Sequence, residues 1–259
     1  MSPSGAVRVT YVGHATVIVE FGKRKFITDP LLTKRIARIG PKRKVGLGLD
    51  AGMLENVEFA VVSHGHFDHL DKRSLCMLPP AAPVVVCPKL TGIVHRSCRR
   101  TAVGIGWWET ADINGARVTG VPAYHFSARP PFHWSGDYQG FVIELEEGGK
   151  KRTVYHAGDC GMSEYFGQIG KKFKLDIAFL PIGAYDPPSF RKHHLAPEDA
   201  LDALEMTGAQ TMVPIHWGTY NLSWEPFDEP PRRLLEFARK RGLEDRVRLL
   251  QPGESAMIG

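Results

Sequence analysis

The sequence predicts an α/β (α+β) fold in which two β-sheets pack face to face and helices cover the outside. Strand-like runs are numerous, which suits two packed sheets. Helical stretches are interspersed among them without strict alternation, which argues against a plain doubly wound sheet. No linker, internal repeat or low-complexity tract interrupts the chain, so we expect residues 1–259 to form a single domain.

Strand-like runs open the chain and recur almost to its end. The first three occupy residues 7–12, 16–21 and 25–28, the third after a turn at Gly22-Lys23. Later strands are expected at residues 59–63, 83–87, 117–121, 140–145, 153–156, 177–180, 211–215 and 248–250.

Helices are expected at four places: after Leu70, after Pro88, and over residues 197–206 and 231–241. Pro197 and Pro231 fit the first turn of a helix, where the missing N–H leaves no bond unmade. Glu198 and Asp199 then place negative charge near the positive end of their helix dipole. These helices would cover the outer faces of the two sheets.

The composition is that of an ordinary globular protein, with 43% hydrophobic and 24% charged residues. No apolar run reaches the length of about 18 residues that a transmembrane helix requires. The first residues lack the basic start, apolar block and cleavage site of a secretory signal, so we expect a cytoplasmic location. In such a chain four scattered cysteines without a C-x-x-C pair are expected to be thiols.

Positive charge is concentrated in one segment. The chain has 33 Lys and Arg against 28 Asp and Glu, a small excess that by itself indicates no partner. Six cations fall within eleven residues: Lys34, Arg35, Arg38, Lys42, Arg43 and Lys44. Such a patch can face nucleic acid, anionic lipid or a phosphorylated substrate, and it can equally be a solvated loop.

Residues 63–71 read Ser-His-Gly-His-Phe-Asp-His-Leu-Asp, directly after the apolar run 59–62. Four candidate ligands, His64, His66, Asp68 and His69, occupy six positions, far more than chance gives with 11 histidines in 259 residues. A strand that ends in such a loop places these side chains at a sheet edge, where sites usually form. Imidazole and carboxylate suit zinc, whereas a structural zinc site would favour thiolates, which this loop lacks. The loop therefore predicts a catalytic metal site.

The H-x-H-x-D-H motif after a strand resembles the signature of the metallo-β-lactamase superfamily. Other segments resemble one branch of it, typified by the phospholipases D that hydrolyse N-acyl-phosphatidylethanolamine, and more distantly the ascorbate-6-phosphate lactonases. The matching segments are Tyr11-Val-Gly-His-Ala-Thr, Thr28-Asp-Pro, the metal loop, Trp107-Trp-Glu, Pro122-Ala-Tyr-His, Ala157-Gly-Asp, Pro181-Ile-Gly-Ala-Tyr, His194-Leu-Ala-Pro-Glu-Asp-Ala, Ile215-His-Trp-Gly-Thr and Asp228-Glu-Pro-Pro. They run in order through nearly the whole chain.

This resemblance implies a four-layer αβ/βα sandwich with two metal ions at one edge, expected to be Zn²⁺, with iron or manganese as alternatives. It also implies a ligand set: His64, His66 and His125 on one ion, Asp68, His69 and His216 on the other, and Asp159 bridging both. Zinc lowers the pKa of a bound water to about 7, so a bridging hydroxide can serve as the nucleophile at neutral pH. Two zinc ions, two carboxylates and one hydroxide leave a small positive charge, which suits a phosphodiester.

The catalytic acid is assigned less directly than the ligands. Asp68 can pass a proton as well as bind metal, and the resemblance places His194 near the reacting group. Asp29 is expected to orient a ligand histidine from outside the ligand set. His14 matches the family without an assigned role, and His193 is expected to face solvent.

Three departures from the related phospholipases alter the pocket and leave the ligands unchanged. Tyr124 stands where glutamine is common, Cys160 where threonine is common, and Ser189-Phe190-Arg191-Lys192 where Trp-Phe-Met is common. Cys160 is expected to be a small residue packed beneath the site. These departures bear on the identity of the substrate.

The leading interpretation is a phosphodiesterase acting on N-acyl-phosphatidylethanolamine, a related phospholipid or another small phosphodiester. The basic segment, with Leu31, Leu32, Ile36 and Ile39 interleaved, would give a peripheral contact with the inner membrane surface. A lactonase or other ester hydrolase is the second interpretation, since the same metals polarise a carbonyl group.

Two further interpretations are weaker. The net positive charge favours a nuclease of the superfamily, but no additional nucleic-acid-binding module is visible, and no nucleic-acid partner is expected. A metal-binding sensor without turnover is disfavoured by the full ligand set. The sequence leaves the oligomeric state open.

Overall fold

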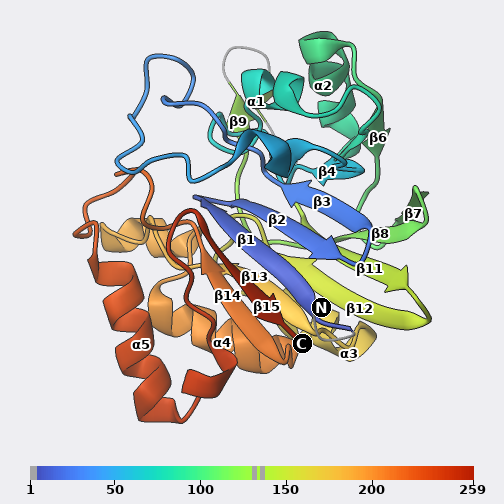
Figure 1. Ribbon diagram of the computed structural model, residues 1–259. Coiled ribbons are helices and arrows are strands. Elements are labelled where there is room, and N and C mark those ends of the chain that lie inside the picture. The colour runs from blue at the N-terminus through green and yellow to red at the C-terminus, as the bar shows by residue number, and fades with distance from the viewer. Residues whose placement is uncertain (1–4, 130–132, 135–137) are drawn as a thin grey trace.

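The computed structural model describes residues 5–129, 133–134 and 138–259 (Figure 1). Two mixed sheets lie face to face, with helices on both outer sides, so the expected four-layer αβ/βα arrangement is confirmed. Figure 1 shows α1 (Lys72–Met77) and α2 (Thr91–Cys98) above one sheet. The other sheet is covered by α3 (Tyr165–Lys172), α4 (Pro197–Thr207) and α5 (Glu229–Arg241).

The first sheet has seven strands in the order β15-β1-β2-β3-β4-β5-β6. Its strands are β1 (Val7–Gly13), β2 (Thr16–Phe21), β3 (Arg24–Thr28), β4 (Phe59–Val61), β5 (Val84–Val86), β6 (Ala102–Gly104) and β15 (Glu254–Ile258). The C-terminal strand β15 forms one edge of this sheet and pairs antiparallel with β1, with Val7 opposite Ile258. The strands from β3 to β6 are parallel to one another.

The second sheet has six strands in the order β14-β13-β12-β11-β8-β7. Its strands are β7 (Thr110–Ile113), β8 (Ala116–Val121), β11 (Gly140–Glu147), β12 (Lys150–His156), β13 (Ile177–Pro181) and β14 (Thr211–Ile215). Strands β12, β13 and β14 are parallel, and β8 shares their direction because β11 is antiparallel to both β8 and β12. The carboxyl ends of β8, β12 and β14 therefore meet at one edge. A separate hairpin pairs β9 (Ala128–Arg129) with β10 (His133–Trp134).

Strand β2 shows how the sequence builds two apolar layers. Its side chains alternate between the two faces of the sheet. Val17 and Val19 belong to the large core between the sheets, whereas Ile18 belongs to the core beneath α1 and α2. Because both faces are covered, the strand is apolar at successive positions and lacks the polar alternation of a solvent-exposed sheet.

Several elements differ from the sequence-based expectation, which gave no strand at the positions of β6, β7, β9 and β10. The strand expected at residues 248–250 is absent, and the chain instead forms β15 at Glu254–Ile258. Helix α3 was not expected, because Gly167 and Gly170 lower the helix propensity of its short segment. At Gly170 a Cβ would lie 2.6 Å from the Thr207 carbonyl oxygen, so glycine permits close packing of α3 on α4.

The expectation that all four cysteines are thiols was wrong for Cys76, which is disulfide-bonded. Cys76 lies on α1, and its bond depends on contacts made by folding, which residue spacing does not reveal. Cys87 and Cys160 are buried thiols that form no disulfide, as expected.

The basic segment is only partly a surface feature. Lys34, Arg35, Arg38, Lys42 and Lys44 are exposed. Arg43 is buried, and its guanidinium donates to the Val12 carbonyl oxygen at 3.2 Å. Leu31, Leu32 and Ile36 are buried as well, so the expectation that they face lipid was wrong. Among the helices of the described ranges, none combines the length and apolar character needed to cross a membrane.

Candidate metal centre

Seven candidate ligands meet at the edge where strands of both sheets end. The loop after β4 carries four of them, and one follows each of β8, β12 and β14. They are His64, His66, Asp68, His69, His125, Asp159 and His216. The sequence identified all seven, although they are spread over 153 positions from His64 to His216.

Three imidazoles form the first group. His64 Nε2 lies 2.9 Å from His66 Nδ1, and His125 Nε2 lies 3.4 Å from the same nitrogen. Burial lowers the pKa of His125 to about 3, despite the opposing effect of Asp159, and burial likewise lowers the pKa of His64. Both are therefore neutral imidazoles at pH 7, the form that binds a metal ion.

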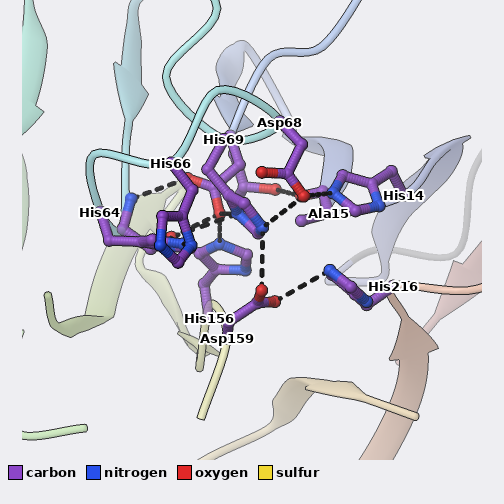
Figure 2. Close-up of polar contacts among 12 residues, drawn as sticks. His14, Ala15, His64, His66, Asp68, His69, His156, Asp159 and His216 are labelled. Carbon is purple, nitrogen blue, oxygen red and sulfur yellow. Dashed lines mark hydrogen bonds and ion pairs between the residues drawn. The ribbon is translucent and has the colours of Figure 1, made fainter. Parts of the chain in front are cut away.

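Asp159 lies between the remaining ligands, as Figure 2 shows. Its Oδ2 is 3.2 Å from His69 Nε2, and its Oδ1 is 3.2 Å from His216 Nε2. Asp68 approaches from the metal loop, with Oδ2 at 3.7 Å from His69 Nε2. The two carboxylate oxygens of Asp159 thus face two different histidines.

Several of these buried atoms have no partner in hydrogen-bonding geometry, although imidazole and carboxylate atoms approach to 3.2 Å. They include His69 Nε2, His216 Nε2 and Asp159 Oδ1. A buried polar atom without a partner is costly, and native proteins rarely leave three side by side. Imidazole and carboxylate donors arranged in this way fit divalent metal ions, which would satisfy all three atoms.

The charges of these side chains also favour a bound metal cation. Burial disfavours a charged His69, but the surrounding carboxylates, foremost Asp159, raise its pKa well above the usual range. Burial would raise the pKa of Asp159, but His216 and His69 lower it instead. The described groups thus hold ionised carboxylates around a proton that a metal ion can replace.

Asp29 holds His69 from the side opposite the ligand group, as expected. Its Oδ2 accepts from His69 Nδ1 at 2.7 Å, and its Oδ1 accepts from the Ser63 backbone N–H at 2.7 Å. His156 Nε2 also donates to Oδ2, at 2.9 Å. These bonds leave His69 Nε2 directed at the other ligands, which is how a carboxylate fixes the ring of a metal-binding histidine. His156 was expected only as a strand end.

His14 occupies a constrained position beside the second group of candidate ligands, which consists of Asp68, His69 and His216. Its backbone is left-handed, with φ of 60°. Its N–H donates to Thr219 Oγ1 at 2.8 Å, and its carbonyl accepts from the His216 N–H at 2.7 Å. The ring points at the site, with Nε2 at 3.0 Å from Asp68 Oδ2. The sequence matched His14 to the family, but its contact with Asp68 is visible only in three dimensions.

His194 lies beside the centre, with Nδ1 at 3.8 Å from Asp159 Oδ2. Burial lowers its pKa to about 4, despite the opposing effect of Asp159, so the ring is neutral at pH 7. Its neighbour His193 is half-buried against Tyr124, with ring centroids 5.7 Å apart. The His193 carbonyl accepts from His125 Nδ1 at 2.9 Å, which directs His125 Nε2 toward the ligand group.

Aromatic side chains border the histidines on their solvent side. Phe126 is 48% exposed and lies 5.1 Å from the His66 ring. Phe190 is partly exposed and lies 6.4 Å from the His194 ring. A substrate with an apolar portion would find contact surface there. Cys160 is buried in the large core, as expected, and burial raises the pKa of its thiol.

Comparison with known proteins adds independent findings. The family model described as Beta-lactamase superfamily domain matches residues 24–217. The chain is 32% identical to N-acyl-phosphatidylethanolamine-hydrolyzing phospholipase D 1 of Caenorhabditis elegans, over 90% of this chain and 70% of that protein. It is 30% identical to a UPF0173 metal-dependent hydrolase of Rubrobacter xylanophilus, over 96% of both chains. Against two further relatives, from Mycobacterium bovis and Saccharomyces cerevisiae, it spans 63% and 53% of their length.

A solved structure is also similar over the whole length. Igni18, a metallo hydrolase from Ignicoccus hospitalis, aligns with a TM-score of 0.75 and 25% identity, covering 98% of this chain and 99% of that one. Sequence and structure comparisons thus point to the same group of hydrolases.

Proposed function

Because the chain belongs to the metallo-β-lactamase superfamily and is a metal-dependent hydrolase, we propose that it cleaves a phosphodiester, most specifically N-acyl-phosphatidylethanolamine or a related phospholipid. One observation carries the proposal. The two oxygens of Asp159 face His69 and His216 separately, with the three-imidazole group alongside. Two-metal centres of this kind suit displacement at phosphorus, because they stabilise both the entering and the departing oxygen.

We assign two ions to the centre, Zn²⁺ by preference, with iron or manganese as alternatives. His64, His66 and His125 would hold one, Asp68, His69 and His216 the other, and Asp159 would contact both. When bound, such ions supply Lewis acidity toward a phosphoryl oxygen and a water of lowered pKa.

The remaining chemistry falls to side chains of the chain itself. His194 is neutral at pH 7 and lies beside the centre, so it can donate a hydrogen bond to a substrate oxygen. Asp68 is held ionised: burial would raise its pKa, but His69 and His14 lower it. Asp68 therefore suits a role in which it accepts a proton and passes it on, and does not store one beforehand.

The lipid assignment has two supports. The nematode relative carries the name of a phospholipase that acts on N-acyl-phosphatidylethanolamine. Partly exposed Phe126 and Phe190 beside the histidines give an acyl chain a place to lie. Hydrolysis of a lactone or other ester is the second candidate. The UPF0173 relative matches over a larger share of its length, and its name gives a metal-dependent hydrolase without a substrate, so it does not favour a phosphodiester over an ester.

A substrate panel tests the proposal. Metal-reconstituted protein is offered N-acyl-phosphatidylethanolamine in mixed micelles, bis-p-nitrophenyl phosphate, a γ-lactone and RNA. We expect both phosphodiesters to be cleaved much faster than the lactone, and Asp159→Ala to lose this activity. Asp245→Ala, at an exposed carboxylate on the 3-10 turn Glu244–Arg246, is the matched control and should retain it. Faster cleavage of the lactone or of RNA would refute the proposal.

A further inference from the structure

Two large apolar side chains are far more exposed than others in the described ranges. Ile39 is 92% exposed and Trp224 is 78% exposed. Ile39 lies in the loop after β3, and Trp224 lies in the segment between β14 and α5. Single exposed apolar residues are common on protein surfaces, so their meaning depends on their surroundings.

The loops that carry these two residues pack against each other (Figure 1). Tyr220 Oη donates to the Thr33 carbonyl at 2.9 Å, and Leu31, Ile36 and Tyr220 form a small apolar cluster. Ala37 and Leu222 pack on that cluster from the two sides. The two loops that carry the exposed side chains therefore share a common core.

The surface of these loops is strongly basic. Lys34, Arg35, Arg38, Lys42 and Lys44 are exposed, and within the described ranges no carboxylate forms an ion pair with them. Two acidic residues follow Trp224 closely in the sequence, Glu225 and Asp228. Glu225 accepts from the backbone N–H groups of Ala184 and Asp186, and Asp228 lies 3.5 Å from Arg232. The five exposed cations of the 34–44 segment therefore face solvent without a paired carboxylate in the described ranges.

The same surface adjoins the metal centre. Tyr220 packs its edge against the His14 ring, with centroids 5.6 Å apart. Arg43 stands over the other side of Tyr220, at 5.7 Å from the ring centroid. A partner that lies on the two loops is thus brought close to the His14 side of the centre.

We propose that residues 34–44 and 221–227 form a docking surface for an anionic phospholipid bilayer, with Ile39 and Trp224 as its apolar anchors. Tryptophan favours the headgroup boundary, and exposed lysine and arginine are attracted to anionic lipid. A single-stranded nucleic acid would use the cations and stack on Trp224, but Ile39 offers no ring for stacking, so the pair of anchors favours lipid. The inference deepens the proposed function, because docking would present a phospholipid substrate to the centre.

Vesicle sedimentation of the full-length, metal-loaded protein tests the docking surface. The vesicles are phosphatidylcholine alone and phosphatidylcholine mixed with phosphatidylglycerol. We expect binding to the mixed vesicles, weakened by salt, and little binding to phosphatidylcholine alone. Ile39→Ser with Trp224→Ser should weaken binding, and Arg38→Glu with Lys42→Glu should weaken it by about tenfold or more.

Matched controls change the same chemistry at a distance. Met257→Ser removes an exposed apolar side chain from β15, and Lys171→Glu with Lys174→Glu reverses two exposed cations around the end of α3. These controls should bind vesicles as the wild type does. All variants should cleave bis-p-nitrophenyl phosphate at the wild-type rate and keep the wild-type melting temperature, because none of them touches the centre.

The outcomes separate docking from chemistry. A wild-type protein that ignores anionic vesicles, or docking variants that bind as well as the controls, would overturn the proposal. So would a basic surface that binds RNA and not lipid, with Arg38→Glu and Lys42→Glu abolishing RNA binding. Vesicle binding by a protein that cleaves no phosphodiester would support the docking surface and refute the proposed function alone.

Discussion

The ring of His14 contacts Asp68, with Nε2 at 3.0 Å from Oδ2, although the two residues are 54 positions apart. His14 is fully enclosed, and burial together with His216 lowers its pKa to about 4, against the opposing pull of Asp68. At pH 7 a neutral ring therefore donates to an ionised carboxylate. The same Oδ2 lies 3.7 Å from His69 Nε2, so this contact holds the carboxylate oxygen that faces the ligand group.

The first prediction concerns that contact. His14→Asn should weaken metal binding by roughly 10- to 100-fold, the usual effect of losing a group that orients a ligand. Asparagine tolerates the left-handed backbone at this position, so the fold should persist. Chelator competition measures the affinity. His95→Asn, at an exposed position on α2, is the control, and His14→Gln, whose amide is longer, should restore part of the affinity. Unchanged affinity in His14→Asn would show that Asp68 needs no such support.

The second prediction concerns stoichiometry. Metal analysis should give two ions per chain, and among single ligand substitutions Asp159→Ala should lower this content most, because its two oxygens face different histidines. His125→Ala should leave the second group loaded. One tightly held ion in the reconstituted wild-type protein would contradict the dinuclear assignment.

The third prediction concerns the release of the His69 proton when metal binds. The metal-free protein holds a proton on His69, whose pKa is raised well above its usual range by Asp159, Asp29 and Asp68 against the effect of burial. Metal binding displaces this proton, so affinity should rise with pH as long as the pH is below that pKa. Calorimetry in buffers of different ionisation enthalpy measures the release. Heats of binding that do not depend on the buffer would show that His69 is already deprotonated.

The fourth prediction concerns Cys160. Its thiol is buried and free, and burial raises its pKa, so it is not a thiolate at neutral pH. Cys160→Ser should keep both metal ions and most of the activity, with a stability loss of about 1 kcal/mol measured by urea unfolding. Abolished turnover with both ions retained would assign this residue a chemical role.

The metal loop and the resemblance to the superfamily predicted the candidate ligands, and the structure brings these side chains together. Each candidate lies past the end of a strand, and parallel strands bring their ends to a common edge. Residues 16–21 and 211–215 match β2 and β14 to the residue, and Pro197 begins α4 as expected. The four-layer fold and the superfamily are confirmed by the structure and by the comparisons.

What the sequence could not predict depends on contacts between distant segments. His156 looks like the last residue of a strand, and only folding places its ring 2.9 Å from Asp29. The sequence of the basic segment suggests a uniformly exposed patch. Lys42 and Lys44 are exposed, but Arg43 is buried, because its guanidinium donates to the Val12 carbonyl oxygen. Charge counts alone do not distinguish such neighbours.

Each ligand group draws on both sheets. In the first group, His64 and His66 follow a strand of the seven-stranded sheet, and His125 follows a strand of the six-stranded sheet. In the second group, His69 follows the seven-stranded sheet and His216 the six-stranded sheet. An ion in either group would therefore link the two sheets, which are also joined by apolar packing and by polar contacts such as that of His156 with Asp29. The free energy of binding would then count toward the resistance of the whole chain to unfolding. In a cell short of the metal, the amount of protein would fall along with its activity, since the metal-free protein would unfold more readily and proteases would then degrade it.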